Sequence, residues 1–249
     1  METNIEFPRI YCINLKTSTD RRERMENRFE HHGLLEAVTF VEAIPRNSPL
    51  VTYYAQNLTC PAYGQTKWRG ELACYASHLK AIRQFLHDGG DFALICEDDI
   101  LLHNNFLGRY VDMITNTPPG TSLITMSYMM ENTGVTKWAG KQPEKKNLLV
   151  IDPVYTWGAQ IYLISQRYAF EVLTTYDKPF YEVCNPLKTS EVIIRESKGL
   201  RAYPPLAIED GIDSDREPAD LPYHHKHFKF WGYSNYSKSE KEHISPLAD

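Results

Sequence analysis

The sequence predicts an α/β fold with a parallel sheet, because its first 44 residues carry strand, helix and strand patterns in turn. Residues 9–15 (RIYCINL) and 38–44 (VTFVEAI) are short β-rich runs without strict alternation, which is typical of strands covered on both faces. Two such strands joined by a helix form a βαβ unit, whose strands run parallel. With 249 residues, of which 42% are hydrophobic, the chain could be one large α/β domain or two small ones.

The helix between these strands is predicted from its apolar face and its two ends. Met25 and Phe29 lie four residues apart and therefore share one helical face. Asp20 and Glu23 have the spacing of a capping box, and Gly33 is placed to end the helix. These signals together predict a helix that begins near Asp20 and ends before Gly33.

The segment from Pro45 to Arg69 is predicted to be a long loop. It shows no clear helix or strand periodicity and contains many Pro, Asn, Thr and Tyr residues. Long loops in compact domains are usually functional or disordered. Two interpretations of its aromatic residues remain open. They stack on a sugar or a base as a lid that excludes water, or they pack down as a small satellite core. These residues are Tyr53, Tyr54, Tyr63 and Trp68.

The strongest helical pattern spans residues 70–90 and leads into the next strand. Its apolar residues recur at helical spacing, and the pair Gly89–Gly90 stops it. Residues 93–102 (ALICEDDILL) then contain a strand. Beyond them we expect a helix near 104–115, strands within 122–129 and 159–165, helices at 167–176 and 189–197, and a last short strand within 199–205.

Composition and charge exclude several classes of partner. The formal net charge is −5 and no basic stripe is visible, so a nucleic-acid partner is not expected. Five cysteines, an odd number without Cys-x-x-Cys spacing, favour reduced thiols over a disulfide framework. No apolar run reaches the length of a transmembrane helix, and the N-terminus lacks a signal peptide's apolar stretch. We expect a cytoplasmic protein with no transmembrane segment, and leave attachment to a membrane surface open.

The acidic triplet Glu97-Asp98-Asp99 interrupts an apolar run at the end of a predicted strand. Parallel α/β sheets bind ligands at the carboxyl ends of their strands. Residues i and i+2 of an extended segment point the same way, so we expect Glu97 and Asp99 to converge and Asp98 to face elsewhere. Such oxygen ligands suit Mg²⁺ or Mn²⁺, which often complete their shell with substrate phosphates. The triplet alone leaves two alternatives, a metal–diphosphate site and a solvated turn.

Four motifs recur here in the order and rough spacing seen in glycosyltransferase family 25, which the chain resembles from about Arg9 to about Pro205. They are YCINLKTSTDRRERM, GELACYASHLKAI, LICEDDILL and WGAQIYLIS. The resemblance implies a GT-A type fold with a mixed central sheet. It places a Rossmann-like half that binds the nucleotide sugar at about 9–116, an acceptor-binding and catalytic half at about 117–209 and an irregular tail at 210–249.

The resemblance also implies an activity. Members of this family, which includes lipooligosaccharide galactosyltransferases and resembles the collagen galactosyltransferases, move a hexose from UDP-galactose or UDP-glucose with inversion. The acceptor would be a hydroxyl of a glycan, glycolipid or glycoprotein, as in lipopolysaccharide biosynthesis. Glu97 and Asp99 match the family's Asp-x-Asp element as Glu-x-Asp, which implies Mn²⁺ or Mg²⁺ as cofactor.

Roles follow for the acids by this resemblance. Asp99 is the first choice for a direct metal ligand, Glu97 is a ligand or accepts a ribose hydroxyl, and Asp98 orients its neighbours. Asp213 and Asp215, with Asp210 just before them, resemble the family's late Asp-Ser-Asp element, and a further metal or phosphate contact is expected there. The alternative for these three residues is a hydrated acidic loop.

Inversion in one step requires a general base, and here the sequence departs from the family. Many members carry a Pro-Val-Asp-like segment where this chain reads NPLKTSEVIIRES, in which Glu191 is the nearest acid in register. Glu191 is therefore the candidate base. The alternative is an ordinary surface ion pair with Arg195, four residues later. The same departure supports a second hypothesis, a non-catalytic member of the fold that binds sugar or a partner protein.

Further candidates for binding the nucleotide sugar lie near the predicted strand ends. The base or diphosphate would contact residues at and after the end of the first strand, from Asn14 to Arg22. Ser77 and His78, on the 70–90 helix, would support the nucleotide site, and Trp157 with Gly158 would approach the sugar. The alternatives are solvated arginines, a buried hydrogen-bonded histidine and a core tryptophan. These candidates are Asn14, Leu15, Arg21, Arg22, Ser77, His78, Trp157 and Gly158.

Overall fold

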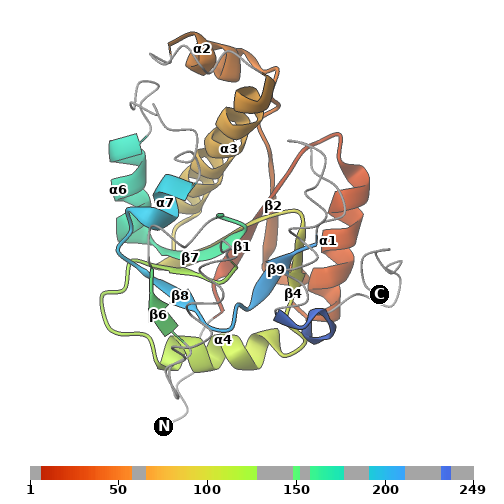
Figure 1. The fold of residues 1–249 in the computed structure, drawn as a ribbon, viewed down its shortest axis with the longest axis vertical. Coiled ribbons are helices and arrows are strands. Elements are labelled where there is room, and N and C mark those ends of the chain that lie inside the picture. The colour runs from red at the N-terminus through yellow and green to blue at the C-terminus, as the bar shows by residue number, and fades with distance from the viewer. Residues whose placement is uncertain are drawn as a thin grey trace.

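A computed structural model describes residues 7–57, 66–127, 148–151, 158–176, 191–210 and 231–236. Within these ranges a seven-stranded sheet has the order β2-β1-β3-β7-β5-β8-β6, and a second sheet pairs β4 with β9 (Figure 1). The strands are β1 (Arg9–Asn14), β2 (Val38–Glu42), β3 (Phe92–Glu97), β4 (Ile100–Leu102), β5 (Leu123–Thr125), β6 (Leu148–Val150), β7 (Ile161–Ser165), β8 (Leu200–Ala202) and β9 (Ala207–Glu209).

The large sheet is mixed. Strand β1 runs parallel to both β2 and β3, whereas β7 runs antiparallel to β3 and β5. The predicted βαβ unit and the α/β class with a mixed central sheet are therefore confirmed. In the register of β1 and β3, Ile13 pairs with Glu97, so both strands end at the same edge.

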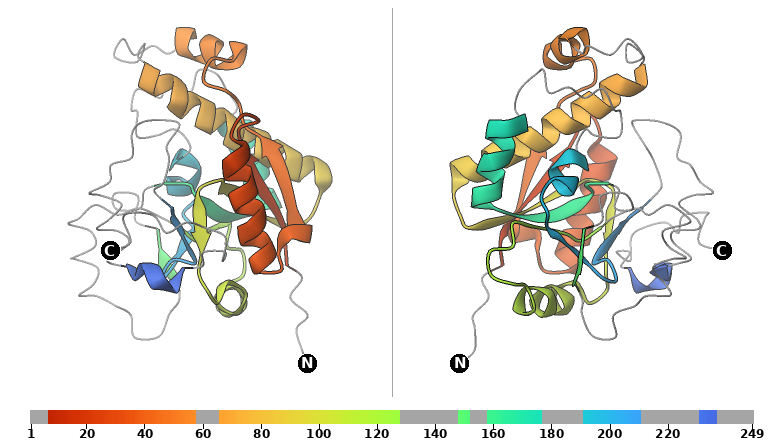
Figure 2. Two further views of the ribbon diagram at one scale, coloured as in Figure 1. Left: turned by 90° about the vertical axis from the view of Figure 1, so that its right-hand side faces the viewer. Right: turned by 60° about the vertical axis from the view of Figure 1, so that its left-hand side comes forward.

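Helices cover both faces of this sheet, as Figure 2 shows with α3 and α6 on one side and α4 on the other. Successive residues of β1 and β3 point to opposite faces of the sheet and belong to two separate hydrophobic cores. The core on the side of α3 and α6 contains Tyr11, Ile13, Ala93 and Ile95. The core on the side of α1 and α4 contains Ile10, Cys12, Leu94 and Cys96. The helices are α1 (Thr19–His31), α2 (Pro49–Asn57), α3 (Thr66–Asp88), α4 (Phe106–Thr115), α6 (Gln166–Tyr176) and α7 (Glu191–Arg195), with short 3₁₀ turns η1 (Leu35–Ala37) and η4 (Tyr233–Asn235).

Helix α1 matches the prediction at its end but not at its start. Met25 and Phe29 are buried together, and Gly33 follows the helix with a φ of 66°, a conformation that favours glycine. The capping box is wrong: Ser18 is the N-cap, no side-chain hydrogen bond caps the helix, and Asp20 lies inside the first turn. Asp20 there complements the helix dipole instead.

The predicted loop from Pro45 to Arg69 contains helical structure, which corrects that prediction. Helix α2 begins at Pro49. Proline is well tolerated at the first helical position, because the N–H that it lacks would have no partner within the helix. Tyr54 is buried with Val51 against Leu72, Ala73 and Ala76 of α3, as the satellite-core interpretation expects.

Of the other three aromatic residues of that segment, Tyr53 has a described side chain, and Tyr63 and Trp68 do not. Tyr53 is 47% exposed on α2, so it is not part of that core. Tyr63 and the side chain of Trp68 lie outside the described residues. Helix α3 begins at Thr66, a few residues before the predicted start, and ends at Asp88 before the two glycines, as predicted.

Three strands were not predicted, namely β4, β6 and β9, and each is three residues long. Strand β9 follows β8, so the strand expected as the last one is not the last. The thiols of Cys12, Cys74 and Cys96 form no disulfide, as expected, while Cys60 and Cys184 lie outside the described residues. No helix in the described ranges combines the length and the apolar character needed to cross a membrane.

Candidate functional site

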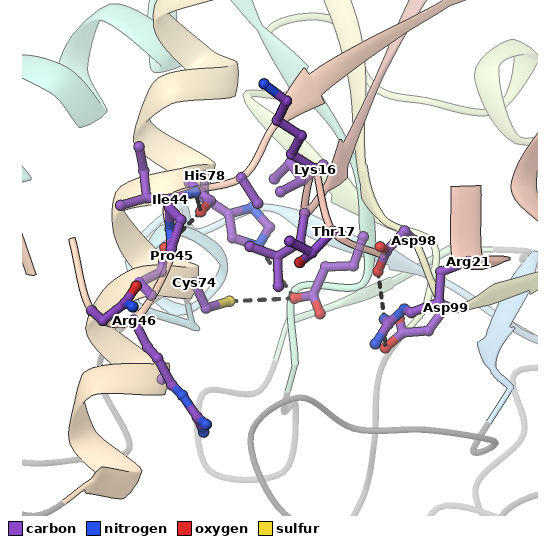
Figure 3. A pocket seen from close by; sticks show the side chains of 18 residues that line it. Lys16, Thr17, Arg21, Ile44, Pro45, Arg46, Cys74, His78, Asp98 and Asp99 are labelled. Atoms are coloured by element: carbon purple, nitrogen blue, oxygen red, sulfur yellow. Dashed lines mark hydrogen bonds and ion pairs between the residues drawn. The ribbon is translucent and has the colours of Figure 1, made fainter. Parts of the chain in front are cut away.

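A cavity of about 490 Å³ opens where β1, β2 and β3 end. Its walls come from the segments that follow these three strands, from Arg21 of α1 and from one face of α3 (Figure 3). All three acids of the triplet line it, together with Leu15, Ser77 and His78. The cavity therefore lies at the carboxyl ends of parallel strands, where the sequence predicts a ligand site.

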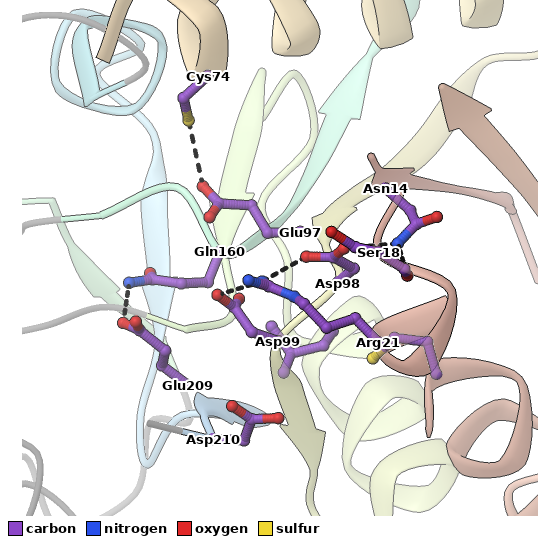
Figure 4. Close-up of polar contacts among 12 residues, drawn as sticks. Asn14, Ser18, Arg21, Cys74, Glu97, Asp98, Asp99, Gln160, Glu209 and Asp210 are labelled. Atoms are coloured by element: carbon purple, nitrogen blue, oxygen red, sulfur yellow. Dashed lines mark hydrogen bonds and ion pairs between the residues drawn. The ribbon is translucent and has the colours of Figure 1, made fainter. Parts of the chain in front are cut away.

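The acids of the triplet are not paired as the sequence predicted. Asp98 and Asp99 both form ion pairs with Arg21, whose Nη2 lies 2.8 Å from Asp99 Oδ2, while Glu97 points toward α3 (Figure 4). The predicted convergence of Glu97 and Asp99 is wrong because the extended backbone ends at Glu97. Asp98 and Asp99 occupy a bend before β4, so the alternation of a strand does not apply to them.

Glu97 instead belongs to a polar group on the α3 side. Its Oε1 lies 3.2 Å from His78 Nε2 and 3.6 Å from Cys74 Sγ. The other ring nitrogen of His78 lies 3.1 Å from the Tyr162 hydroxyl, and the imidazole is fully buried. Cys74 was not among the predicted site residues, although it lies four residues before His78 and so on the same helical face.

Asn14 and Ser77 hold the walls of the cavity in place. The Asn14 amide donates to Asp98 Oδ2 at 2.7 Å and to the Ser18 carbonyl at 3.1 Å, so it ties the acidic bend to the start of α1. The Ser77 hydroxyl accepts from the Ile44 amide at 2.8 Å and donates to the Ala73 carbonyl at 2.6 Å. Asn14 does not line the cavity, so its role in the described structure is to position Asp98.

Among the described residues, Asp99 is surrounded by more negative charge than Arg21 balances. Burial raises the pKa of the Asp99 carboxyl well above its usual value, and the nearby charges of Glu209, Glu97 and Asp210 raise it further, against the lowering effect of Arg21. Burial likewise raises the pKa of Asp98. Asp99 Oδ1 is buried and accepts no hydrogen bond from the described residues. An uncovered carboxylate oxygen among excess acids fits a bound cation.

Glu209 and Asp210 reach this place because β9 pairs antiparallel with β4. The Asp210 amide donates to the Asp99 carbonyl at 2.7 Å, which joins the end of β9 to the acidic bend. Gln160 donates to Glu209 at 3.3 Å. Glu209 is a neighbour that the sequence analysis missed, and Asp210, named there with the late acids, is the one of them that the structure describes.

Exposed cations at the cavity were also missed. Lys16 follows β1 and Arg46 follows β2, and both line the cavity with exposed side chains. Their signal in the sequence is position: each is a basic residue within a few residues of a predicted strand end. Cations at that edge are suited to the phosphates of a nucleotide.

Several predicted residues lie elsewhere. Arg22 stacks over the Phe40 ring at 4.4 Å, pairs with Glu26 at 2.9 Å and does not line the cavity. Gly158 has a φ of 90°, and a Cβ atom at this position would lie only 2.3 Å from the Gln160 side chain. The glycine therefore leaves room for Gln160, which donates a hydrogen bond to Glu209.

The predicted base is only partly described. Glu191 begins α7, and the residues that follow it, Val192 to Ile194, are buried in the core, while its own side chain lies outside what the structure describes. Trp157, Asp213 and Asp215 are also outside the described residues. Their predicted roles stay predictions.

The fold defines an α/β protein with a cavity at the carboxyl ends of parallel strands. The particular family follows from sequence comparison: the profile described as glycosyltransferase family 25 (LPS biosynthesis protein) matches residues 7–183. The chain belongs to glycosyltransferase family 25, as the sequence motifs predicted.

Curated relatives of the chain have low identity to it and are much longer than the matched region. Procollagen galactosyltransferase 1-B of Xenopus laevis is 24% identical over 245 residues, which is 87% of this chain and 39% of the relative. Procollagen galactosyltransferase 1 of Danio rerio is 24% identical over 175 residues, 67% of this chain and 28% of the relative. The inactive glycosyltransferase 25 family member 3 of Homo sapiens is 30% identical over 113 residues, 43% of this chain and 19% of the relative.

Solved structures with partial similarity are also glycosyltransferases by their titles. One is a glycosyltransferase involved in the glycosylation of the major capsid of PBCV-1, at 9% identity and a TM-score of 0.34, covering 83% of this chain and 95% of that one. The other is mouse xyloside xylosyltransferase 1 in its apo form, at 9% identity and a TM-score of 0.36, covering 77% of each chain.

Proposed function

We propose that this protein transfers a hexose, galactose or glucose, from a UDP-sugar to a hydroxyl of a glycan or glycoconjugate, with inversion and with the help of Mn²⁺ or Mg²⁺. Membership of glycosyltransferase family 25 and the names of the galactosyltransferase relatives support the reaction class. One observation supports the metal dependence: Asp99 Oδ1 is a buried carboxylate oxygen that accepts no hydrogen bond from the described residues.

In this proposal Asp99 is the direct ligand of a divalent ion, and Asp213 and Asp215, outside the described residues, complete the protein's share of the shell. Glu209 and Asp210 add negative charge close by. The ion, when bound, offsets the charge that develops on the departing diphosphate. Glu97 points to α3 and is therefore assigned away from this ion, which leaves its alternative role as an acceptor for a ribose hydroxyl.

Other residues of the chain bind and orient the donor. Lys16 and Arg46 are exposed at the cavity and meet the phosphates, and Leu15 offers an apolar contact to the base. Arg21 holds Asp98 and Asp99 in place rather than meeting the diphosphate directly, because its guanidinium already binds both carboxylates. Glu191 remains the proposed general base.

The proposal is tested by titrating UDP into the protein with and without Mn²⁺, using calorimetry. We expect UDP affinity to fall at least about tenfold without the ion, which corresponds to about 1.4 kcal/mol, because phosphates and uncompensated carboxylates repel. Asp99→Asn should give the same loss in the presence of Mn²⁺. Asp112→Asn, an exposed acid on α4, is the matched control and should bind as the wild type does. Equal UDP affinity in EDTA and in Mn²⁺ would refute the metal role.

A second candidate is a non-catalytic member of the family that binds sugar or a partner protein. A relative whose name marks it as inactive, and the altered segment around Glu191, favour it. Measuring UDP release from a panel of UDP-sugars with acceptor glycans separates the two. Turnover that Glu191→Gln abolishes while Mn²⁺-dependent UDP binding persists supports the enzyme. Binding without turnover by the unmodified protein supports the alternative.

A further inference from the structure

The cavity contains a second polar group whose chemistry differs from that of the acidic bend. Cys74, His78 and Glu97 each offer one donor atom, and these sulfur, nitrogen and oxygen atoms all lie within 4.8 Å of one another. Cys74 and His78 are four residues apart and therefore lie on the same face of α3. Glu97 is the last residue of β3 and lies opposite them. Figure 3 shows Cys74 and His78 side by side on α3 at the cavity wall, and Figure 4 shows Glu97 pointing toward Cys74.

Two of the three separations, those to Glu97, match the edges of a coordination tetrahedron. Zinc bonded to nitrogen, oxygen and sulfur at ordinary lengths implies a nitrogen–oxygen edge of about 3.4 Å and a sulfur–oxygen edge of about 3.6 Å. The observed distances are 3.2 Å from His78 Nε2 to Glu97 Oε1 and 3.6 Å from Cys74 Sγ to the same oxygen. A cation can therefore replace the hydrogens that the thiol and imidazole direct at Glu97, with little movement of the side chains.

The surroundings of His78 suit a metal ligand. Its Nδ1 lies 3.1 Å from the Tyr162 hydroxyl, and the two rings stack with centroids 5.8 Å apart. When Nε2 binds a metal, the ring proton resides on Nδ1, and a fixed oxygen acceptor there sets the tautomer and ring orientation.

We propose that Cys74, His78 and Glu97 bind a tetrahedral divalent cation of the zinc type, with the fourth coordination position open to the cavity. A thiolate and a carboxylate balance the charge of Zn²⁺, and sulfur and nitrogen ligands select it over Mn²⁺ or Mg²⁺. Three protein ligands with an open position are the arrangement of zinc sites that bind a water or a ligand. In this proposal Glu97 is a zinc ligand instead of the acceptor of a ribose hydroxyl; the centre does not include Asp99 and does not depend on sugar transfer.

Binding of Co²⁺ and Zn²⁺ to the metal-stripped, reduced full chain tests the proposal. We expect one equivalent of Co²⁺ to give a thiolate charge-transfer band and the visible absorption of tetrahedral cobalt. Zn²⁺ should displace it, and a chromophoric chelator then reports the zinc affinity. Cys74→Ser should abolish the charge-transfer band and lower zinc affinity by more than about 100-fold, and Tyr162→Phe should lower it by about 10- to 100-fold.

Controls separate this site from other ligands and from the proposed function. His87→Gln, an exposed histidine on the same helix, and the double variant Cys60→Ser/Cys184→Ser should keep the band. Asp99→Asn should keep zinc binding while losing Mn²⁺-dependent UDP binding, so that the two proposals fail independently. If Cys74→Ser does not fold, as judged by its circular dichroism and thermal unfolding, Glu97→Gln tests the same site with its shape preserved. A cobalt spectrum without thiolate character, or equal zinc affinity in the wild type and the folded ligand variant, would overturn the proposal.

Discussion

The two ends of helix α1 both place an arginine in an ion pair, but the two pairs differ in what surrounds them. At the core end, Arg28 pairs with Asp210 at 2.9 Å and donates to the Ile100 carbonyl at 2.9 Å, and both charged side chains are at most 2% exposed. At the cavity end, Arg21 faces two carboxylates, Asp98 and Asp99, and its side chain is 12% exposed.

The difference indicates which acids are available for chemistry. The Arg28 pair lies between α1, β4 and the end of β9, where it holds these elements together. The Arg21 group has more carboxylates than cations, and one of its oxygens, Asp99 Oδ1, accepts no hydrogen bond from the described residues. A buried ion pair adds little net stability but is costly to break. The core end is therefore structural, and the cavity end has negative charge left for a ligand.

The largest effect should come from breaking the pair at the core end. Arg28→Ala leaves the Asp210 carboxylate buried without its partner, and this is expected to lower the free energy of unfolding by about 3–5 kcal/mol. Urea unfolding followed by circular dichroism measures the loss. Mn²⁺ should raise the unfolding temperature of this variant no more than that of the wild type, because the ion pairs of Arg21 with Asp98 and Asp99 are unchanged in it.

A paired replacement controls for the removal of charge itself. The double variant Arg28→Met/Asp210→Leu replaces both charges by apolar groups of comparable size and should recover most of the lost stability. If Arg28→Ala is as stable as the wild type, the core pair is not structural and the comparison between the two ends of α1 fails.

Removing the arginine at the cavity end should cost less and be reversed by a metal ion. Arg21→Met leaves Asp98 and Asp99 without this cation, and we expect a loss of about 1–3 kcal/mol, because their side chains are 9% and 10% exposed whereas that of Asp210 is 2% exposed. Mn²⁺ should then stabilise this variant more than the wild type. An ion at 100 times its Kd contributes about 2.7 kcal/mol.

Thermal unfolding with and without Mn²⁺ compares the three proteins directly. Arg21→Met should show a larger Mn²⁺-induced rise in Tm than the wild type or Arg28→Ala. Equal Mn²⁺ shifts in all three would mean that the acids around Arg21 do not bind the ion, and the proposed role of Asp99 would have to be abandoned.

Most of the fold was predictable because its signals are local. Strand β1, the end of α1 at Gly33, and α3 are each specified by periodicity and stop signals within a short window. Strands β4, β6 and β9 were missed because their three-residue runs carry no periodicity, whereas β5 and β8, of the same length, lie within longer runs that predicted a strand. Strand β4 exists only because β9, about 100 residues later, pairs with it.

The site was predictable in its position but not in its pairings. A strand that ends in acids points to the sheet edge. The side-chain directions depend on where the extended backbone stops, which is at Glu97, two residues before the Asp99 that the triplet's spacing implied. Arg28 could have been suspected, since it shares an apolar helical face with Met25, and a charge on such a face needs a buried partner. Its partner Asp210 is distant in sequence and could not be identified without the fold.

The smallest effect should come from Arg22, the residue next to Arg21, which the sequence placed near the diphosphate. Its side chain is half-exposed, stacks over Phe40 and pairs with Glu26 four residues along α1. Exposed contacts of this kind contribute little, so Arg22→Ala should change the free energy of unfolding by no more than about 1 kcal/mol. UDP affinity in Mn²⁺, measured by calorimetry, should not change.

Lys16→Ala is the matched comparison for Arg22, because Lys16 is also an exposed cation close to the end of β1 but lines the cavity. We expect it to weaken UDP binding in Mn²⁺ while Arg22→Ala does not. A tenfold loss with Arg22→Ala and none with Lys16→Ala would reverse this assignment. In that case the start of α1 as a whole faces the donor, and the boundary between its structural and ligand-binding parts lies beyond Arg22.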